Sequence, residues 1–269
     1  MLVVADNNPT RHIRVAWVNW AIMALCTLIF LVQTPWQPYA FTPAHLHLVG
    51  GPKAPGGAPQ VIGQMVSYIF LHATWLHLLG NMVVLWVFGD NIEDSMGHWR
   101  YALFFVLCGM AGAGAEALFA VDPAVPVIGA SGAIAGVMAA YLLLHPRARV
   151  VVLVAFKVPV MVPAGLFVGL SITLDVVAAL SPAQGEVTVA FLAHIGGFLA
   201  GIVLLLLLRR RDVPLFQPPP ATATNGALAL GRFLPQFGLE GAGESRLWFW
   251  TKTAVFFIVV SVAVEWVLA

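Results

Sequence analysis

The sequence predicts an all-α membrane protein, a polytopic bundle of seven transmembrane helices. Of its 269 residues, 60% are hydrophobic and only 9% are charged, whereas soluble domains contain about 25% charged residues. The apolar residues also gather in long runs, and about 20 of them suffice to cross a bilayer as a helix. The net charge of +1 gives no indication of a nucleic-acid-binding surface. The composition therefore predicts the lipid bilayer as the surrounding medium.

The apolar runs divide the chain into spans and connections. Residues 1–14 show no clear cleavage site, so we expect the first run to remain as a helix. The second and fourth runs are short, and Arg149–Val158 is expected to be a cytoplasmic connector. Residues 15–211 form the predicted core, 212–246 a cytoplasmic linker, and 247–269 a C-terminal helix. The predicted spans are Val15–Val32, Trp75–Phe88, Tyr101–Ala120, Ile128–Leu144, Val160–Leu180, Val187–Leu208 and Leu247–Leu268.

Positive charges gather in every second connection: before the first span, between the second and third, between the fourth and fifth, and after the sixth. Cytoplasmic loops carry the excess of Lys and Arg. The N-terminus is therefore expected to be cytoplasmic, with the second, fourth and sixth spans entering from the outer side. The first outer loop, residues 34–74, is rich in Pro and Gly and contains a segment expected to be flexible, residues 50–59. The charges that set this orientation are Arg11, Arg14, Arg100, Arg147, Arg149, Lys157, Arg209, Arg210 and Arg211.

Polar residues recur at the outer ends of the three even-numbered spans. His77 and Asn81 lie in the second span, Ser131 opens the fourth, and His194 lies in the first turns of the sixth. At 1.5 Å rise per residue, all of them should lie within roughly 10 Å of the outer surface. Ionisable residues inside a membrane are costly and usually functional. Three helices thus bring polar groups to one depth.

Glycine patterns in the fourth and sixth spans predict close packing of these two helices. Gly132 and Gly136 form one small-residue ridge, and Gly197 and Gly201 form another. Because Ser131 and His194 adjoin the two ridges, close packing would bring a hydroxyl within reach of an imidazole. A serine beside a histidine base is the minimal activated nucleophile.

His77 and Asn81 are four residues apart and share a helix face. A neutral imidazole N–H and a carboxamide NH₂ are both hydrogen-bond donors. They could stabilise the oxyanion formed when Ser131 attacks a carbonyl group. Taken singly, each group also has a structural interpretation, as helix packing for the serine or as a helix cap for His77 and Asn81.

Three motifs in these spans resemble the rhomboid family of intramembrane serine proteases. They are Gly129-Ala130-Ser131-Gly132, His77-Leu78-Leu79-Gly80-Asn81, and Ala193-His194-Ile195-Gly196-Gly197 followed by Gly201. The stretch Gly89–Gly109 is similar to the connection between the second and third spans of bacterial members. The resemblance covers Val15–Leu208 in the right order, and a six-plus-one helix arrangement is found in some members.

The resemblance implies a catalytic dyad with Ser131 as nucleophile and His194 as general base. His77, Asn81 and the backbone N–H of Ser131 would form the oxyanion hole, and Gly129, Gly132, Gly136, Gly197 and Gly201 would support helix packing. The implied substrates are single-span membrane proteins cleaved near the outer face, and the implied location is a cell membrane, such as the bacterial inner membrane. Some members carry a Tyr one turn after the nucleophile where this chain has Ala135, and a Trp-Arg pair in the first outer loop, which this chain lacks.

Other polar residues have more than one interpretation. Asp175 could line a substrate gate or hydrate a cavity, or it could reach the outer interface. Glu116 is similar, and neither is predicted to be a third catalytic member. His72 could line the mouth of a cavity or lie in the interface. No cofactor and no metal are expected, because His45 and His47 have no further ligand nearby and no HExxH motif is present. The alternative functions are a rhomboid-like scaffold that binds membrane proteins without cleaving them, and a small-solute transporter.

Overall fold

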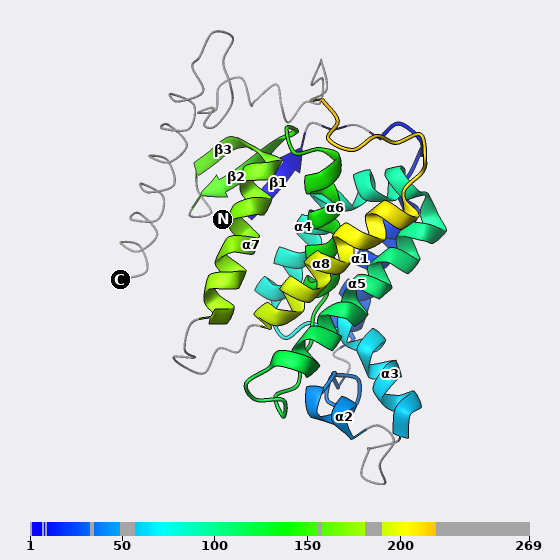
Figure 1. The fold of residues 1–269 in the computed structure, drawn as a ribbon, viewed down its shortest axis with the longest axis vertical. Coiled ribbons are helices and arrows are strands. Elements are labelled where there is room, and N and C mark those ends of the chain that lie inside the picture. Colours follow the sequence, from blue (N-terminus) through cyan, green and yellow to red (C-terminus); the bar gives the residue numbers. More distant parts are fainter. Residues whose placement is uncertain are drawn as a thin grey trace.

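A computed structural model describes residues 2–6, 8, 10–32, 35–48, 57–154, 158–180 and 190–218. It is a mostly helical bundle with a small sheet at one end and two short helices at the other (Figure 1). The helices are α1 (Trp17–Leu31), α2 (Pro43–His47), α3 (Gly57–Ser67), a 3₁₀ turn η1 (Tyr68–Phe70), α4 (Trp75–Met96), α5 (His98–Phe119), α6 (Ser131–Leu144), α7 (Ala164–Leu180) and α8 (Phe191–Leu208). The strands are β1 (Leu2–Asp6), β2 (Arg149–Val154) and β3 (Val158–Pro163).

Apolar helices suited to a membrane occur throughout the described residues. By length and composition α5 and α8 are long enough to cross a bilayer, and α3–η1 and α4 would form one span bent by 84°. Helices α1, α6 and α7 are apolar but shorter. These helices are consistent with a polytopic membrane protein. The predicted seventh helix, Leu247–Leu268, lies outside the described residues.

The second predicted span was wrong in length. Helix α4 has 22 residues and continues eight residues beyond Phe88. The polar run after Asp90 suggested a helix end, but Asn91, Glu93 and Asp94 are buried. Each of them has hydrogen-bond partners in the N-terminal segment, so the polar turn is stabilised inside the protein.

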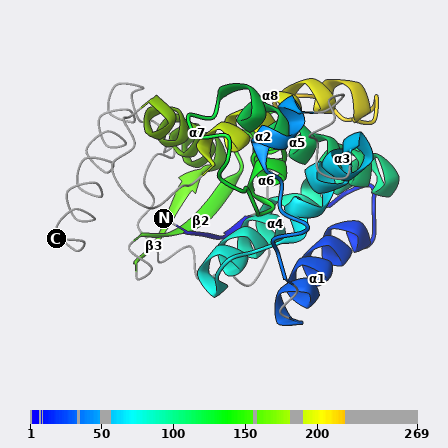
Figure 2. The ribbon, with the colours of Figure 1, turned by 90° about the horizontal axis from the view of Figure 1, so that it is seen from below.

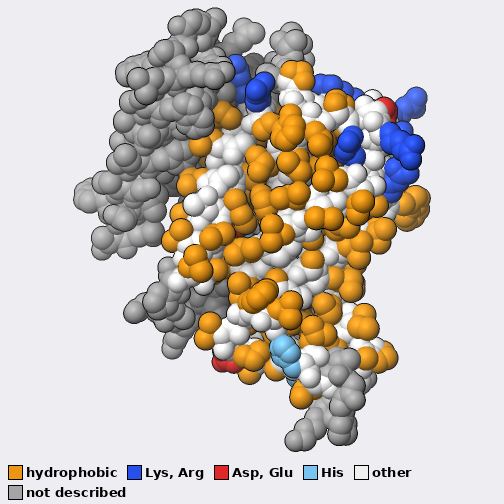
Figure 3. All heavy atoms as spheres, viewed as in Figure 1, with side chains coloured by type: hydrophobic (Ala, Val, Ile, Leu, Met, Phe, Trp, Pro, Cys, Tyr) orange, Lys and Arg blue, Asp and Glu red, His pale blue; other side chains and the backbone are white. Residues whose placement is uncertain are grey.

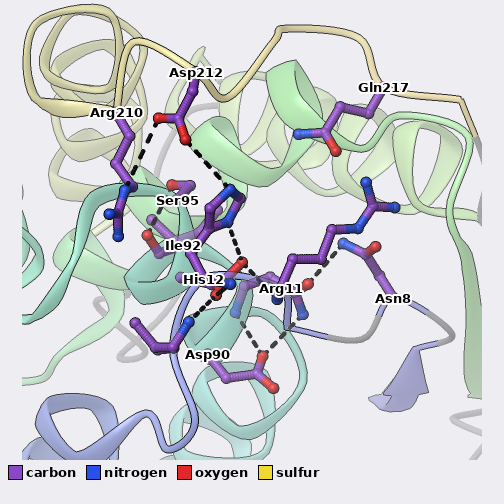
Figure 4. Close-up of polar contacts among 12 residues, drawn as sticks. Asn8, Arg11, His12, Asp90, Ile92, Ser95, Arg210, Asp212 and Gln217 are labelled. Atoms are coloured by element: carbon purple, nitrogen blue, oxygen red, sulfur yellow. Dashed lines mark hydrogen bonds and ion pairs between the residues drawn. The ribbon is translucent and has the colours of Figure 1, made fainter.

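The N-terminal segment is tied to this end of α4 by a polar network (Figure 4). Asp94 accepts hydrogen bonds from the backbone N–H groups of His12 and Ile13 at 2.6 and 2.7 Å. Figure 4 also shows the His12 ring between α4 and Asp212, which follows α8. Glu93 accepts from the backbone N–H groups of Val18 and Asn19, in the first turn of α1. A carboxylate of α4 therefore caps α1.

The connector predicted over Arg149–Val158 contains β2 and the first residue of β3, which form a three-stranded antiparallel sheet with β1. Residues Val160–Pro163, predicted to open the fifth span, belong to β3, so the all-α prediction was incomplete. β2 pairs with β3 with Val151 opposite Met161, and β1 adds to the other edge of β2. The run of β-branched valines favours strands, but it is apolar enough to be mistaken for the start of a membrane helix.

The first predicted loop is partly folded. Of residues 34–74, the structure describes α2, α3 and η1, and an isolated bridge joins Phe41 to Val127 in the loop before α6. The Tyr68 hydroxyl donates to the carbonyl of Gly109 on α5 at 2.7 Å. This loop therefore packs against the segment that leads into α6.

Helix α6 lies in the middle of the bundle, with α1 and α7 on opposite flanks (Figure 2). Ten of its 14 residues are buried. On the face that Figure 3 shows, hydrophobic side chains cover the middle, while arginine side chains lie toward the sheet end. Exposed large apolar residues include Trp20, Leu28, Trp86, Leu103, Leu199 and Leu207. Such a surface fits lipid.

Candidate functional site

Ser131 is the first residue of α6 and is half-buried. The fourth span was expected from Ile128, but the helix begins three residues later. Gly129, predicted to support helix packing, instead lies in the preceding loop with a φ of +124°, which side chains rarely tolerate. The backbone N–H of Ser131 belongs to the first turn, whose N–H groups have no intrahelical partner. The hydroxyl of Ser131 and a backbone N–H without an intrahelical partner therefore lie together at the start of α6.

Helix α6 is shorter than a membrane core is thick. Its fourteen residues at 1.5 Å each span about 21 Å, less than the roughly 30 Å of a bilayer core. Irregular backbone in a membrane, such as the loop before Ser131 would be, is tolerated where protein or a water-filled cavity surrounds it.

Helices α6 and α8 approach each other along their glycines. A β-carbon built on Gly197 would lie 2.7 Å from the carbonyl carbon of Gly132, and one on Gly201 would lie 2.5 Å from the α-carbon of Gly136. One on Gly132 would lie 3.1 Å from the carbonyl oxygen of Ala193. The residue after Ser131 thus packs on the residue before His194. The backbone contact brings the first turns of the two helices together.

Helix α5 completes the packing around the first turn of α8. A β-carbon on Gly112 would lie 2.7 Å from the carbonyl oxygen of Ala193. The residue before α8, Ala190, offers no capping side chain, and Glu116 of α5 accepts the backbone N–H of Ala193 at 3.0 Å. The same N–H also donates to the carbonyl oxygen of Ala190 at 3.1 Å, and the carboxylate suits the positive end of the helix dipole. Glu116 therefore fixes the start of α8 rather than reaching an interface.

His194 points its Nδ1 atom at a carboxylate of α7. The distance to Oδ2 of Asp175 is 3.1 Å, and the side chains are 17% and 24% exposed. Neither interpretation of Asp175 from the sequence included this contact. Its signal in the sequence was present, because Asp175 is the only charged residue between Ala164 and Leu180.

His77 and Asn81 face the loop before Ser131. A β-carbon on Gly129 would lie 2.7 Å from Nε2 of His77 and 3.9 Å from Nδ2 of Asn81. The hydroxyl of Thr74 accepts the backbone N–H of His77 at 3.1 Å, which caps α4. Both side chains therefore lie next to the loop that presents Ser131.

His72, interpreted from the sequence as lining the mouth of a cavity or lying in the interface, belongs to this cluster. It is buried, and its Nε2 atom lies 3.0 Å from Nδ2 of Asn81. Its ring centroid lies 5.1 Å from that of His77. The amide of Asn81 has two N–H groups, so one can bind His72 while the other remains available. The contact depends on the 84° bend before α4, which no local pattern indicates.

Within the described ranges, no group of three or more His, Cys, Asp or Glu side chains is arranged to hold a metal ion. His47, one of the two histidines with metal-like spacing, has its Nε2 atom 2.6 Å from the carbonyl oxygen of Ala117. The chemistry of the cluster thus consists of a hydroxyl, imidazoles, an amide and a carboxylate.

Comparison with known proteins gives a family for this arrangement. The model of the Rhomboid domain matches residues 59–211. "Rhomboid-like protein 11, chloroplastic" of Arabidopsis thaliana is 31% identical over 154 residues, which cover 55% of this chain and 52% of that protein. "Rhomboid-related protein 2" of Mus musculus is 30% identical over 149 residues, covering 52% and 45%. "RHOMBOID-like protein 2" of Arabidopsis thaliana is 33% identical over 149 residues, covering 54% and 43%. The chain thus spans about half the length of the curated relatives it matches.

Proposed function

Because the chain belongs to the rhomboid family, we propose that it is an intramembrane serine endopeptidase with Ser131 as nucleophile and His194 as general base. The observation that carries the proposal is the glycine contact between α6 and α8. It brings the residues beside Ser131 and His194 within van der Waals distance. A hydroxyl held beside an imidazole is the arrangement that nucleophilic catalysis requires.

In the proposed reaction, Oγ of Ser131 attacks the scissile carbonyl and its proton passes to His194. The carbonyl oxygen becomes negatively charged and accepts hydrogen bonds from the backbone N–H of Ser131, from His77 and from Asn81. His194 then gives the proton to the leaving amine, and an acyl group stays on Ser131. Water, activated by the same imidazole, releases the acyl group. Preorganised donors of this kind are usually the largest contribution to such catalysis.

The proposed substrates are single-span membrane proteins. The site lies among membrane helices, so a substrate helix would arrive laterally and would have to unwind, because a helical peptide bond hides its carbonyl. We therefore expect small residues at the cleaved bond and helix-weakening Gly or Pro beyond it. Replacing those substrate residues with Leu should slow cleavage in reconstituted vesicles.

The proposed orientation puts the arginine-rich sheet end in the cytoplasm, following the rule that cytoplasmic loops carry the positive charge (Figure 3). Ser131 would then open toward the outer side. A Ser131→Cys variant should react with an impermeant thiol reagent added outside, and the native Cys26 and Cys108 should react little because both are buried. Reaction from the cytoplasmic side alone would contradict this orientation.

Cleavage of a single-span reporter by the full chain in vesicles tests the proposed chemistry. Ser131→Ala and His194→Ala should each abolish cleavage and fluorophosphonate labelling, and the double variant should lose little more than either single one. Ser171→Ala is the matched control, since that hydroxyl bonds the carbonyl of Phe167 within α7. Full activity in either single variant would reject the dyad. Reporter binding without cleavage or labelling by the wild type would favour a scaffold.

A further inference from the structure

We propose that Asp175 is a positioning residue for His194, so that the site works as a Ser–His–Asp arrangement whose third member comes from α7. The inference rests on the proposed protease function and deepens it. Sequence reasoning predicted a dyad without an acid. The 3.1 Å contact between Nδ1 of His194 and Oδ2 of Asp175 gives the imidazole a partner on one specific nitrogen.

The apolar surroundings of Asp175 favour a hydrogen bond to its carboxylate. Asp175 lies on a helix whose neighbouring Leu174, Val177 and Leu180 are large, apolar and exposed on the surface. A carboxylate among such residues, at membrane depth, is costly unless it is hydrogen-bonded. His194 supplies that hydrogen bond. The pair is only partly exposed, at 17% and 24%, so water competes with it less than at an open surface.

The nitrogen that Asp175 contacts decides the tautomer of His194. A carboxylate accepts, so the proton of a neutral His194 must lie on Nδ1, which leaves the lone pair of Nε2 free. When the hydroxyl of Ser131 attacks, its proton goes to Nε2 and the new C–O bond forms from the oxygen lone pair. The carbonyl π electrons move to the oxyanion. Asp175 stays ionised and stabilises the imidazolium, as the acid of serine protease triads does.

Glu116 is the other carboxylate near His194, but it binds the backbone at the start of α8. Its Oε1 atom accepts the backbone N–H of Ala193 at 3.0 Å, and no hydrogen bond from it to the His194 ring is found among the described residues. His77 is an imidazole and offers a hydrogen-bond donor rather than an acid. The remaining aromatic neighbour, Phe191, meets the ring edge-on at 6.3 Å and cannot choose a tautomer. Asp175 is thus the group placed to orient the ring.

The decisive variant is Asp175→Asn in the full chain, assayed on the reporter in vesicles. The amide keeps the shape but can donate to Nδ1, which moves the proton to Nε2 and removes the base. We expect kcat to fall on the order of 10²–10⁴-fold, with KM unchanged within about threefold because substrate binding is not touched. Asp175→Glu, which keeps a carboxylate, should recover part of the loss. Thr173→Val is the matched control, because Thr173 lies on the same helix and its exposed hydroxyl bonds the carbonyl of Gly169 one turn earlier.

A second readout does not depend on catalysis. The ¹⁵N shifts of His194 in the Ser131→Ala protein should show the proton on Nδ1, and the addition of Asp175→Asn should move it to Nε2. A merely structural role for Asp175 would lower thermal stability and would leave the tautomer unchanged.

The outcomes separate the two proposals. A wild type that cleaves through Ser131, together with an Asp175→Asn variant of equal kcat and unchanged tautomer, would overturn the role of Asp175 and leave the protease function standing. A wild type that neither cleaves nor labels would overturn the protease function and, with it, the role of Asp175. If Asp175→Asn does not fold, Asp175→Glu and the shifts of the Ser131→Ala protein decide, since protonation of Nε2 there would reject the inference.

Discussion

Replacement of Gly197 by alanine tests whether the glycine contact sets the distance between the proposed nucleophile and base. The added β-carbon would lie 2.7 Å from the carbonyl carbon of Gly132, whereas ordinary contacts are 3.4–4 Å. Helices α6 and α8 must therefore separate locally by about 0.7 Å or more. The neighbouring atoms are backbone and cannot rotate aside, so the separation falls on the first turns of both helices.

The size of the expected effect follows from that displacement. A misplacement of 1 Å can cost about 10²-fold in rate, so kcat/KM for the reporter should fall roughly 10- to 100-fold. Overpacking should also lower the free energy of unfolding by about 1–3 kcal/mol. The assay is cleavage in vesicles, with the folded fraction measured in parallel by thermal unfolding in detergent.

Gly114→Ala provides the control for the change from glycine to alanine itself. Gly114 lies inside α5, and a β-carbon there would meet nothing within 4 Å. Alanine favours a helix over glycine by up to about 1 kcal/mol, so this variant should be as stable as the wild type or more so, and fully active. If Gly197→Ala cleaved as fast as Gly114→Ala, the reasoning from glycine contact to Ser–His distance would be refuted.

Further predictions concern the oxyanion donors, the cap of α8 and the N-terminal strand. His77→Ala and Asn81→Ala should each lower kcat by about 10²–10³-fold without abolishing fluorophosphonate labelling, and unchanged kcat would remove them from the oxyanion hole. Glu116→Ala should lower the free energy of unfolding by about 0.5–2 kcal/mol through loss of the cap on Ala193, whereas Glu116→Gln, which keeps an acceptor, should lose less. Desolvation raises the pKa of Asp6 from 3.8 to about 7, although the hydrogen bond from Tyr141 acts in the opposite direction. Between these two pH values the folded state binds more protons than the unfolded state, so the free energy of unfolding falls as pH rises from about 4 to about 7. The melting temperature of Asp6→Asn relative to wild type should therefore rise across that window, and a constant difference would contradict it.

The local parts of the fold could be predicted from sequence because they depend on composition and spacing. The apolar runs around α1, α5 and α8 predicted helices near their observed bounds. The end of α4 could not be predicted in this way, since Glu93 and Asp94 look like a surface run. They are buried because the N-terminal segment and the start of α1, 74 to 83 residues earlier, donate backbone hydrogen bonds to them. Such contacts exist only after the helices have assembled.

The same difference between local signals and long-range contacts applies to the candidate site. Ser131, His194, His77 and Asn81 could be selected because each stands out as polar in an apolar run. The partner of His194 could not be selected, because Asp175 lies 19 residues earlier on another helix and its contact depends on how α7 packs on α8. The small sheet was not predicted for a related reason. Valine-rich strands are as apolar as membrane helices, and the hydrogen-bond pairing that distinguishes a strand is not visible in the sequence.

Three neighbouring helices each constrain a different property of His194. Glu116 of α5 fixes where α8 begins, because it binds the N–H of the preceding residue. The glycines of α6 fix how closely α8 approaches Ser131. In the proposed arrangement, Asp175 of α7 fixes the rotation and tautomer of the ring through its contact with Nδ1. Because reactive groups must be held within about 0.5 Å and 10–20° of productive geometry, a base on a single helix would not be held well enough by its own backbone. Because each of these helices contributes one contact around His194, polar and small residues are concentrated on the four helices near this imidazole. The remaining surface of the bundle has no such contacts to make and is apolar.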